Sequence, residues 1–244
     1  MKQPQPDDDD NALFATLATV SAQLFLIVGG VIPYIPQYYE IVSTGNSSGF
    51  SLYVCLAIVA SSLLRISYWF RKSYDIALLF QSIVMVICMV VMLELCIRTE
   101  RRNGRFRSEH FFLELEPAYF WKWTDLLSYL QAMVFIMVIS TFVVLFLGWV
   151  PGMAESVGFS ALVIEACLAL PQFLNNYNNK TTHGMNKAMV CLWGLGDIFK
   201  LTYYLTREVP LPFLLCACFQ FLLDVLILAQ IFIYGDHPKS GTDR

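Results

Sequence analysis

The residues best suited to chemistry in this 244-residue chain lie inside long apolar stretches, where ionisable side chains are costly and usually serve a function. An acidic group in such a place can hold a proton or a cation, and a pair of basic groups can face an anion. The candidates are Arg65, Glu165, Asp197, Lys200, Gln220 and Asp224.

Asp197 is the first choice among them, because it lies beside Gly194 and Gly196 in an otherwise apolar run. Lys200 follows one helical turn later, so the two side chains are predicted to pair on one face. The pair is either a structural ion pair or a functional site, and the spacing favours neither. Arg65 lies near the end of its run, where snorkelling to the interface explains it equally well.

Glu165 precedes Pro171 by one and a half turns and is placed to face the centre of a helical bundle. Gln220 and Asp224 share one helix face, because residues four apart lie above one another. A polar stripe of this kind indicates either hydrogen bonds between helices or a wet path, and we expect hydrogen bonds for the glutamines.

These residues must be positioned by membrane helices. The chain is 57% hydrophobic and 14% charged, against about 25% charged in soluble domains. Helices are favoured over open strands, because lipid offers no hydrogen-bond partners to unpaired backbone N–H and C=O groups. Seven apolar runs approach the ~20 residues that cross a bilayer: 13–36, 50–70, 76–97, 125–149, 156–175, 187–206 and 211–234. The sequence therefore predicts an all-α membrane protein of seven transmembrane helices.

Other functional classes find little support. The net charge of −3 argues against a nucleic-acid surface, and no P-loop or HExxH motif suggests an enzyme. The seven cysteines lie in apolar runs and the three histidines outside them, so we expect no metal and no cofactor. Asp7 to Asp10 oppose a signal peptide, which predicts that the first apolar run is retained.

Lysine and arginine predict the orientation. Four lie on the side of the N-terminus and ten on the other side, which is therefore expected to be cytosolic. Residues 1–12 are then lumenal and the tail 235–244 is cytosolic. The longest loop, 98–124, begins with a basic part. Its charges either follow the general excess of lysine and arginine in cytosolic loops or attract anionic lipid. Its aromatic part is predicted to lie at the headgroup boundary.

An internal repeat divides the chain. A shift of 135 residues aligns 29–70 with 164–205 and puts two Pro-Gln pairs, Pro36-Gln37 and Pro171-Gln172, in register. Gly49 also meets Gly184, and Arg65 meets Lys200. The pattern predicts two parallel three-helix units, at 13–97 and 155–234, joined by a linker helix at 125–150 (a 3+1+3 plan).

The Pro-Gln pairs are predicted hinges. Proline removes a helical hydrogen bond and frees a carbonyl, and the amide of the following glutamine can satisfy polar groups nearby. A single pair would read as a helix end at the last turn before a loop. Two pairs in register favour a functional bend at Pro36, Gln37, Pro171 and Gln172.

The segments VIPYIPQYYEIVSTGNSSGFSLYVCL and LALPQFLNNYNNKTTHGMNKAMVCLW resemble the two signatures of the PQ-loop repeat family, whose fold is shared by SWEET sugar carriers and KDEL receptors. The resemblance extends from about residue 13 to 235 and implies the 3+1+3 fold. In carriers of this family, an acidic residue in the region that corresponds to Asp197 is linked to proton coupling.

The resemblance further implies phospholipid translocation across endosome and trans-Golgi membranes, with endosome-to-Golgi retrograde transport. A proton-coupled carrier of a small amino-acid-like solute remains open, and so does a sorting receptor on the same fold. The expected partners are membrane lipids, with protons or a small solute in the second case, and a homo-oligomer also remains open. Composition and spacing do not separate these functions.

Overall fold

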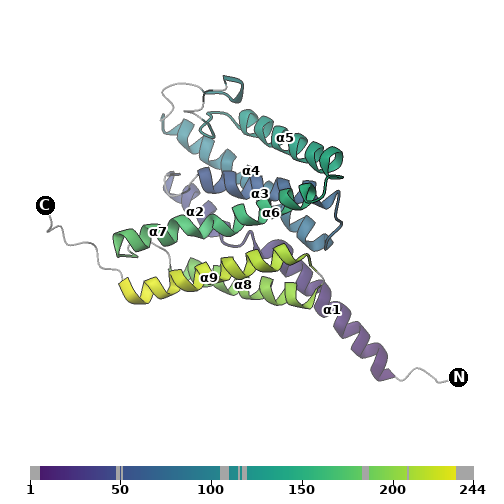
Figure 1. Cartoon of the computed structure of the whole chain (residues 1–244). Helices are drawn as coiled ribbons and strands as arrows, with labels where there is room; N and C mark the ends of the chain where they lie inside the picture. Colours follow the sequence, from purple (N-terminus) through teal and green to yellow (C-terminus); the bar gives the residue numbers. More distant parts are fainter. Residues whose placement is uncertain are drawn as a thin grey trace.

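The computed structural model describes residues 6–47, 50, 52–104, 110–114, 116, 120–182, 187–207 and 209–234, and within these ranges it contains helices and no strand (Figure 1). The helices are α1 Pro6–Gly29, α2 Tyr34–Thr44, α3 Leu52–Trp69, α4 Ile76–Arg102, η1 Phe112–Glu114, α5 Leu126–Phe142, η3 Val143–Leu147, α6 Met153–Ala166, η4 Cys167–Ala169, α7 Leu170–Asn179, α8 Lys187–Thr206 and α9 Leu211–Tyr234.

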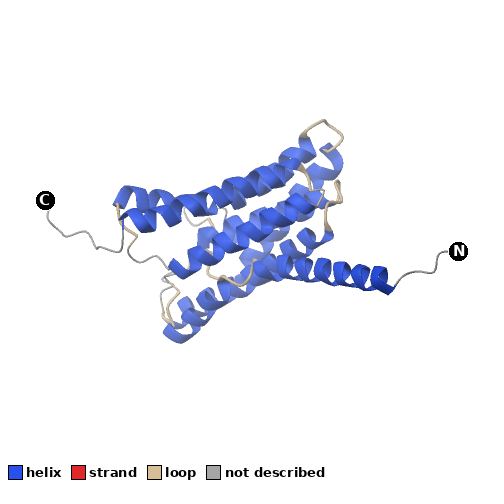
Figure 2. Ribbon diagram, turned by 90° about the horizontal axis from the view of Figure 1, so that it is seen from below, coloured by secondary structure: helices blue, strands red, loops and turns tan. Residues whose placement is uncertain are grey.

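Long helical stretches cross the molecule side by side, and α1 extends beyond the others towards the N-terminus (Figures 1 and 2). In the described ranges six are apolar and long enough to span a membrane: Thr16–Thr44, Leu52–Trp69, Ile76–Arg102, Leu126–Leu147, Met153–Asn178 and Leu211–Tyr234. The seventh, α8, is more polar because it carries Asp197 and Lys200. The all-helical membrane fold predicted from the sequence is confirmed.

Two bundles of equivalent arrangement make up the fold. In the first, α4 packs between α3 and the α1–α2 pair, and in the second, α9 packs between α8 and the α6–α7 pair. The bundles meet mainly where α3 packs along α6, whereas α1 and α8 make far fewer contacts. The linker helix α5 lies along α3, and its π-helical extension η3 reaches α6.

The first helix of each bundle is broken near its Pro-Gln pair. A turn at residues 30–33 separates α1 from α2, and the 3₁₀ turn η4 separates α6 from α7. Pro36 and Pro171 both lie in the first turn of the segment that follows, where a missing backbone N–H costs no helical hydrogen bond. The alternative prediction, that each pair ends its helix, is wrong because α2 and α7 continue beyond it.

Cross-bundle contacts gather at the predicted lumenal end. Lys72 Nζ lies 2.8 Å from Glu155 Oε1, which raises the pKa of Lys72, and Tyr203 donates a hydrogen bond to Asp75. One apolar core cluster contains buried residues of both bundles, including Tyr68, Tyr74, Leu162, Tyr204 and Phe213.

The aromatic part of the long loop differs in part from its prediction. Trp121 and Trp123 are 0% and 5% exposed, because they fold back onto Tyr129 of α5. The Tyr129 hydroxyl lies 3.3 Å from the carbonyl oxygen of each tryptophan and holds them there. Leu113 and Phe120 are exposed, as expected for an interfacial segment.

Some residues used in the predictions lie outside the described ranges. These are the repeat pair Gly49 and Gly184, the tail 235–244, and several residues of the charge count: Lys2, Arg105, Arg107, Lys239 and Arg244.

The predicted orientation has a direct test. Asn46-Ser47-Ser48 and Asn179-Lys180-Thr181 are glycosylation sequons on the predicted cytosolic side, so neither should carry sugar. A sequon in a peptide appended to the N-terminus should be glycosylated in the same chain. We would measure the glycosidase-sensitive mass of both forms expressed in cells. Sugar on the unextended chain would reverse the orientation.

The contact between α3 and α6 depends on Gly158. A Cβ atom there would approach the Tyr68 ring to 2.8 Å, whereas a Cβ at Gly196 of α8 would meet nothing within 4 Å. We expect Gly158→Ala to destabilise the protein by about 1–3 kcal/mol through overpacking. Gly196→Ala is the matched control and should change little. The thermal unfolding midpoint in detergent measures both, and equal midpoints would contradict the close packing.

Candidate functional site

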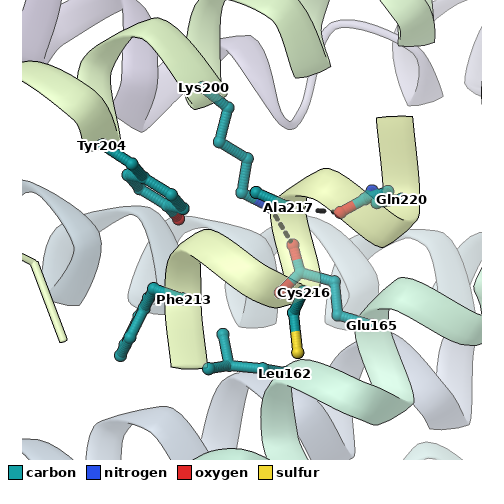
Figure 3. Close-up of a pocket in the computed structure, with 8 residues that line it drawn as sticks. All are labelled: Leu162, Glu165, Lys200, Tyr204, Phe213, Cys216, Ala217 and Gln220. Atoms are coloured by element: carbon teal, nitrogen blue, oxygen red, sulfur yellow. Dashed lines mark hydrogen bonds and ion pairs between the residues drawn. The ribbon is translucent and has the colours of Figure 1, made fainter. Parts of the chain in front are cut away.

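The predicted cations and one predicted acid meet where the bundles join. Arg65 of α3 forms an ion pair with Glu165 Oε2 of α6, and Lys200 Nζ of α8 lies 2.9 Å from Glu165 Oε1 (Figure 3). The side chains of Arg65, Lys200 and Glu165 are 3%, 10% and 17% exposed. One carboxylate is therefore shared by a cation from each bundle. We call Arg65, Glu165 and Lys200 the ion triad.

The repeat explains this convergence. Arg65 and Lys200 occupy equivalent positions on the second helix of each bundle, so the symmetry brings them to the same interface. The equivalent of Glu165 in the first bundle is Gly30, at the same shift of 135 residues. The acid comes only from the second bundle, so the triad is symmetric in its cations and asymmetric in its anion.

Asp197 has a different partner from the one predicted. Lys200 points to Glu165, while the carboxyl group of Asp197 lies beside that of Asp224 on the neighbouring helix α9. The described residues show no direct ion pair between Asp197 and Lys200, although the charge of Lys200 still acts on Asp197, because Lys200 points to Glu165 and α8 packs against α9. Two carboxyl groups can share a hydrogen bond only when one of them carries a proton. This acid pair is 7% and 2% exposed.

The predicted hydrogen bonding of the helix-9 glutamines is confirmed. Gln220 Oε1 lies 3.4 Å from Lys200 Nζ, and Gln230 Nε2 donates to the carbonyl of Phe173 at 3.1 Å. Gln230 thus satisfies a backbone group two residues beyond Pro171.

The hinge residues lie apart from the ion triad, at the helix breaks. Pro36 and Gln37 belong to α2, and Pro171 and Gln172 to α7. Gln172 Nε2 donates to Asn176 Oδ1 at 2.8 Å, so it stabilises the segment that follows the break. The structure describes one conformation, so the role of these four residues as hinges stays a prediction.

Tyr204 was missed by the sequence reasoning. It is 2% exposed, points into the same pocket as Lys200 and Glu165, and its hydroxyl has no hydrogen-bond partner among the described residues (Figure 3). Its spacing was a usable signal. Asp197, Lys200, Tyr204 and Arg207 follow one another at intervals of three or four and so share one face of the helix.

The site is narrow and rich in donors. The space beside the triad is closed by its side chains and has almost no room for even a water molecule, whereas typical ligand pockets measure roughly 300–1,000 Å³. Arg65 Nε, like the Tyr204 hydroxyl, is buried without a partner in the described part of the chain. The donors of this site suit the oxygen atoms of a small anionic group that takes the place of Glu165, and the adjacent acid pair can hold a proton. The described residues include no group of three metal-ligating side chains.

Comparison with known families agrees with the repeat. The model of the PQ loop repeat family matches residues 21–78 and 153–213, one match in each bundle. The chain is therefore a PQ-loop repeat protein.

Curated relatives include both lipid and solute proteins. Scramblase ANY1 of Saccharomyces cerevisiae is 23% identical over 76% of this chain and 63% of its own length. The vacuolar lysine transporter YPQ1 and the vacuolar histidine transporter YPQ3 of the same yeast are 25% and 26% identical, over 38% and 36% of this chain and 29% of each transporter. The chain thus spans less than two thirds of each of these relatives. No solved structure matches it.

The shared carboxylate predicts an order of stabilities. Glu165→Gln leaves two buried cations without an anion and should cost about 3–5 kcal/mol. Arg65→Gln and Lys200→Gln should each cost less, because one neutral pair remains. Glu155→Gln, in an exposed pair, is the control and should change little. Thermal unfolding in detergent ranks the variants. A larger loss for Arg65→Gln than for Glu165→Gln would contradict the sharing.

Proposed function

We propose that this PQ-loop repeat protein moves phospholipids between the leaflets of an internal membrane, in the manner of a scramblase. The observation that carries the proposal is the buried ion triad at the junction of the two bundles. A headgroup crossing the hydrocarbon core must exchange water for other polar partners. The triad and acid pair are such partners, placed inside the membrane-spanning helices.

The polar groups follow a line along the membrane normal. Glu165 and Asp224 lie near the middle of their spans. From Asp197 the polar face of α8 runs through Lys200 and Tyr204 to the predicted lumenal end. A lipid headgroup can move along such a face while its acyl chains stay in the bilayer.

The similarity to scramblase ANY1, over 76% of the chain, supports the lipid assignment. Within the family the strings GDIFK and FWKW resemble the solute carrier family 66 member 2 kind, from which we infer action in endosome and trans-Golgi membranes and in retrieval between them.

A proton-coupled solute carrier is the second candidate, and the acid pair is the observation that favours it. The carboxyl groups of Asp197 and Asp224 lie beside each other, and two such buried groups can share one proton because adjacent negative charges repel each other. A carrier could load and release that proton in each cycle. The two vacuolar amino-acid transporters among the relatives agree with this reading over part of the chain.

Motion in either case needs a bend, and the broken first helix of each bundle supplies one. Pro36-Gln37 and Pro171-Gln172 each follow a break at an equivalent place. In this proposal the two breaks let the bundles rock about the triad, as in other carriers built from parallel repeats.

Reconstitution separates the two functions. Liposomes with fluorescent phosphatidylcholine in both leaflets receive the purified chain, and a membrane-impermeant quencher is added outside. We expect fluorescence loss beyond the outer-leaflet fraction seen in empty liposomes. Lys200→Gln should slow the loss about tenfold, equivalent to ~1.4 kcal/mol of barrier. Lys72→Gln, whose lysine lies outside the triad, should match the wild type.

The same liposomes test the alternative. With an imposed proton gradient and labelled lysine or histidine, a solute carrier would accumulate the amino acid, and Asp197→Asn would abolish the proton dependence. Fluorescence loss equal to that of empty liposomes would contradict the lipid function.

A further inference from the structure

We propose that Arg65 and Lys200 form a binding site for the phosphate of a phospholipid headgroup, and that Glu165 occupies this site as an internal substitute when no lipid is bound. The inference deepens the proposed function and rests on it. It follows from the donors at the site, the asymmetry of the repeat and the position of Glu165 beside a helix break.

The donors outnumber what Glu165 can accept. A guanidinium and an ammonium together present eight N–H groups, and the two carboxylate oxygens of Glu165 face both of them. Arg65 Nε and the Tyr204 hydroxyl are buried with no partner in the described ranges. A phosphodiester brings two anionic oxygens and two ester oxygens, so it can accept more of these donors than a carboxylate does.

The repeat indicates that the anion is the member of the triad that can be exchanged. Both bundles provide a cation at the equivalent position, but the first has Gly30 where the second has Glu165. Beside Gly30 lies Gln81, which is 7% exposed and whose Oε1 has no partner within the described residues. A purely structural ion pair in each bundle would need an acid in each. One acid for two cations leaves a site that a mobile anion can share.

Glu165 is also the member of the triad best placed to leave. It lies in the last turn of α6, directly before the break at η4 and Pro171. It is the most exposed of the three side chains, at 17%, while Arg65 and Lys200 come from unbroken helices. A bend at the break would draw the carboxylate away from cations that stay in place. Phosphate binding and bending at Pro171 would then be coupled.

The packing of the site limits what can bind there. In the described conformation the space beside the triad has almost no room for a further molecule, so a bound phosphate would have to take the place of the Glu165 carboxylate. The chemistry alone fits both a lipid phosphate and a free phosphate ester. Glu165 and Gln220 are the partly exposed polar members, so the acyl chains of a bound lipid would remain outside the bundle.

Removing the Glu165 carboxylate, the internal substitute, should strengthen phosphate binding. We would titrate the purified full chain in detergent with dioctanoyl phosphatidylcholine and obtain Kd from the shift of the unfolding midpoint. For Glu165→Gln we expect Kd about tenfold lower than for the wild type, because the competing carboxylate is gone. Glu165→Asp keeps the charge but shortens the reach to two cations. It should fold more readily and show a smaller gain.

Control variants test whether the gain comes from this site, and control ligands test which part of the lipid binds. Glu155→Gln, a matched change in an exposed pair, should leave Kd unchanged, and adding Arg65→Gln to Glu165→Gln should remove the gain. Dioctanoylglycerol has the chains without the phosphate and should not bind more tightly to Glu165→Gln. Glycerol 3-phosphate has the phosphate without the chains. A gain as large as that of the lipid would keep the phosphate site and overturn its assignment to a lipid.

The results distinguish this inference from the function on which it rests. Equal Kd values for wild type, Glu165→Gln and Glu165→Asp would overturn the internal substitute, even if the wild type moves lipid in liposomes. A tenfold gain without lipid movement would support the phosphate site and overturn the scramblase function. A gain with dioctanoylglycerol as large as with the phospholipid would show that chain contacts are responsible, and would overturn the site.

Discussion

The structure depends on one carboxylate that is shared by two buried cations. Glu165 joins Arg65 of one bundle to Lys200 of the other, inside helices whose outer faces are apolar. Buried charges are tolerated only when they are paired and hydrogen-bonded, so the bundles cannot part here without leaving a cation exposed to hydrocarbon. The interaction therefore sets how the bundles meet, and any movement between them must supply a replacement for it.

The repeat accounts for both the order of the fold and its exceptions. Equivalent helices take equivalent places, and Arg65 and Lys200 follow that rule. Glu165 against Gly30 and Asp197 against Ser62 break it, and these differences define the triad and the acid pair. The proposed site therefore lies where the second bundle has carboxylates that the first bundle lacks at the equivalent positions.

Sequence reasoning predicted the spans and the repeat because these depend on composition and local spacing. It placed Arg65 and Lys200 as a positive pair and recognised Glu165, although it assigned Lys200 to Asp197. Spacing along one helix shows which residues share a face, but it cannot show which neighbouring helix supplies a better partner.

The sequence also did not predict which side chains are buried where the long loop folds back onto α5. Trp121 and Trp123 have the composition of an interfacial segment, yet contacts with Tyr129 bury them. The hydroxyl of Tyr204 became important only when the packing left it beside the triad without a partner in the described residues. In each case the deciding contact joins residues from different helices or loops, which local patterns do not encode.

The two ends of the described structure differ in how they hold the bundles. At the predicted lumenal end, Lys72–Glu155 and Asp75–Tyr203 cross from one bundle to the other. At the opposite end, described contacts such as Ser47–Glu100 and Lys180–Tyr234 stay within one bundle. The helix breaks lie between the triad and this less connected end. A bend there can separate the segments beyond the breaks while the lumenal contacts stay closed, so the site would open first toward the predicted cytosolic leaflet.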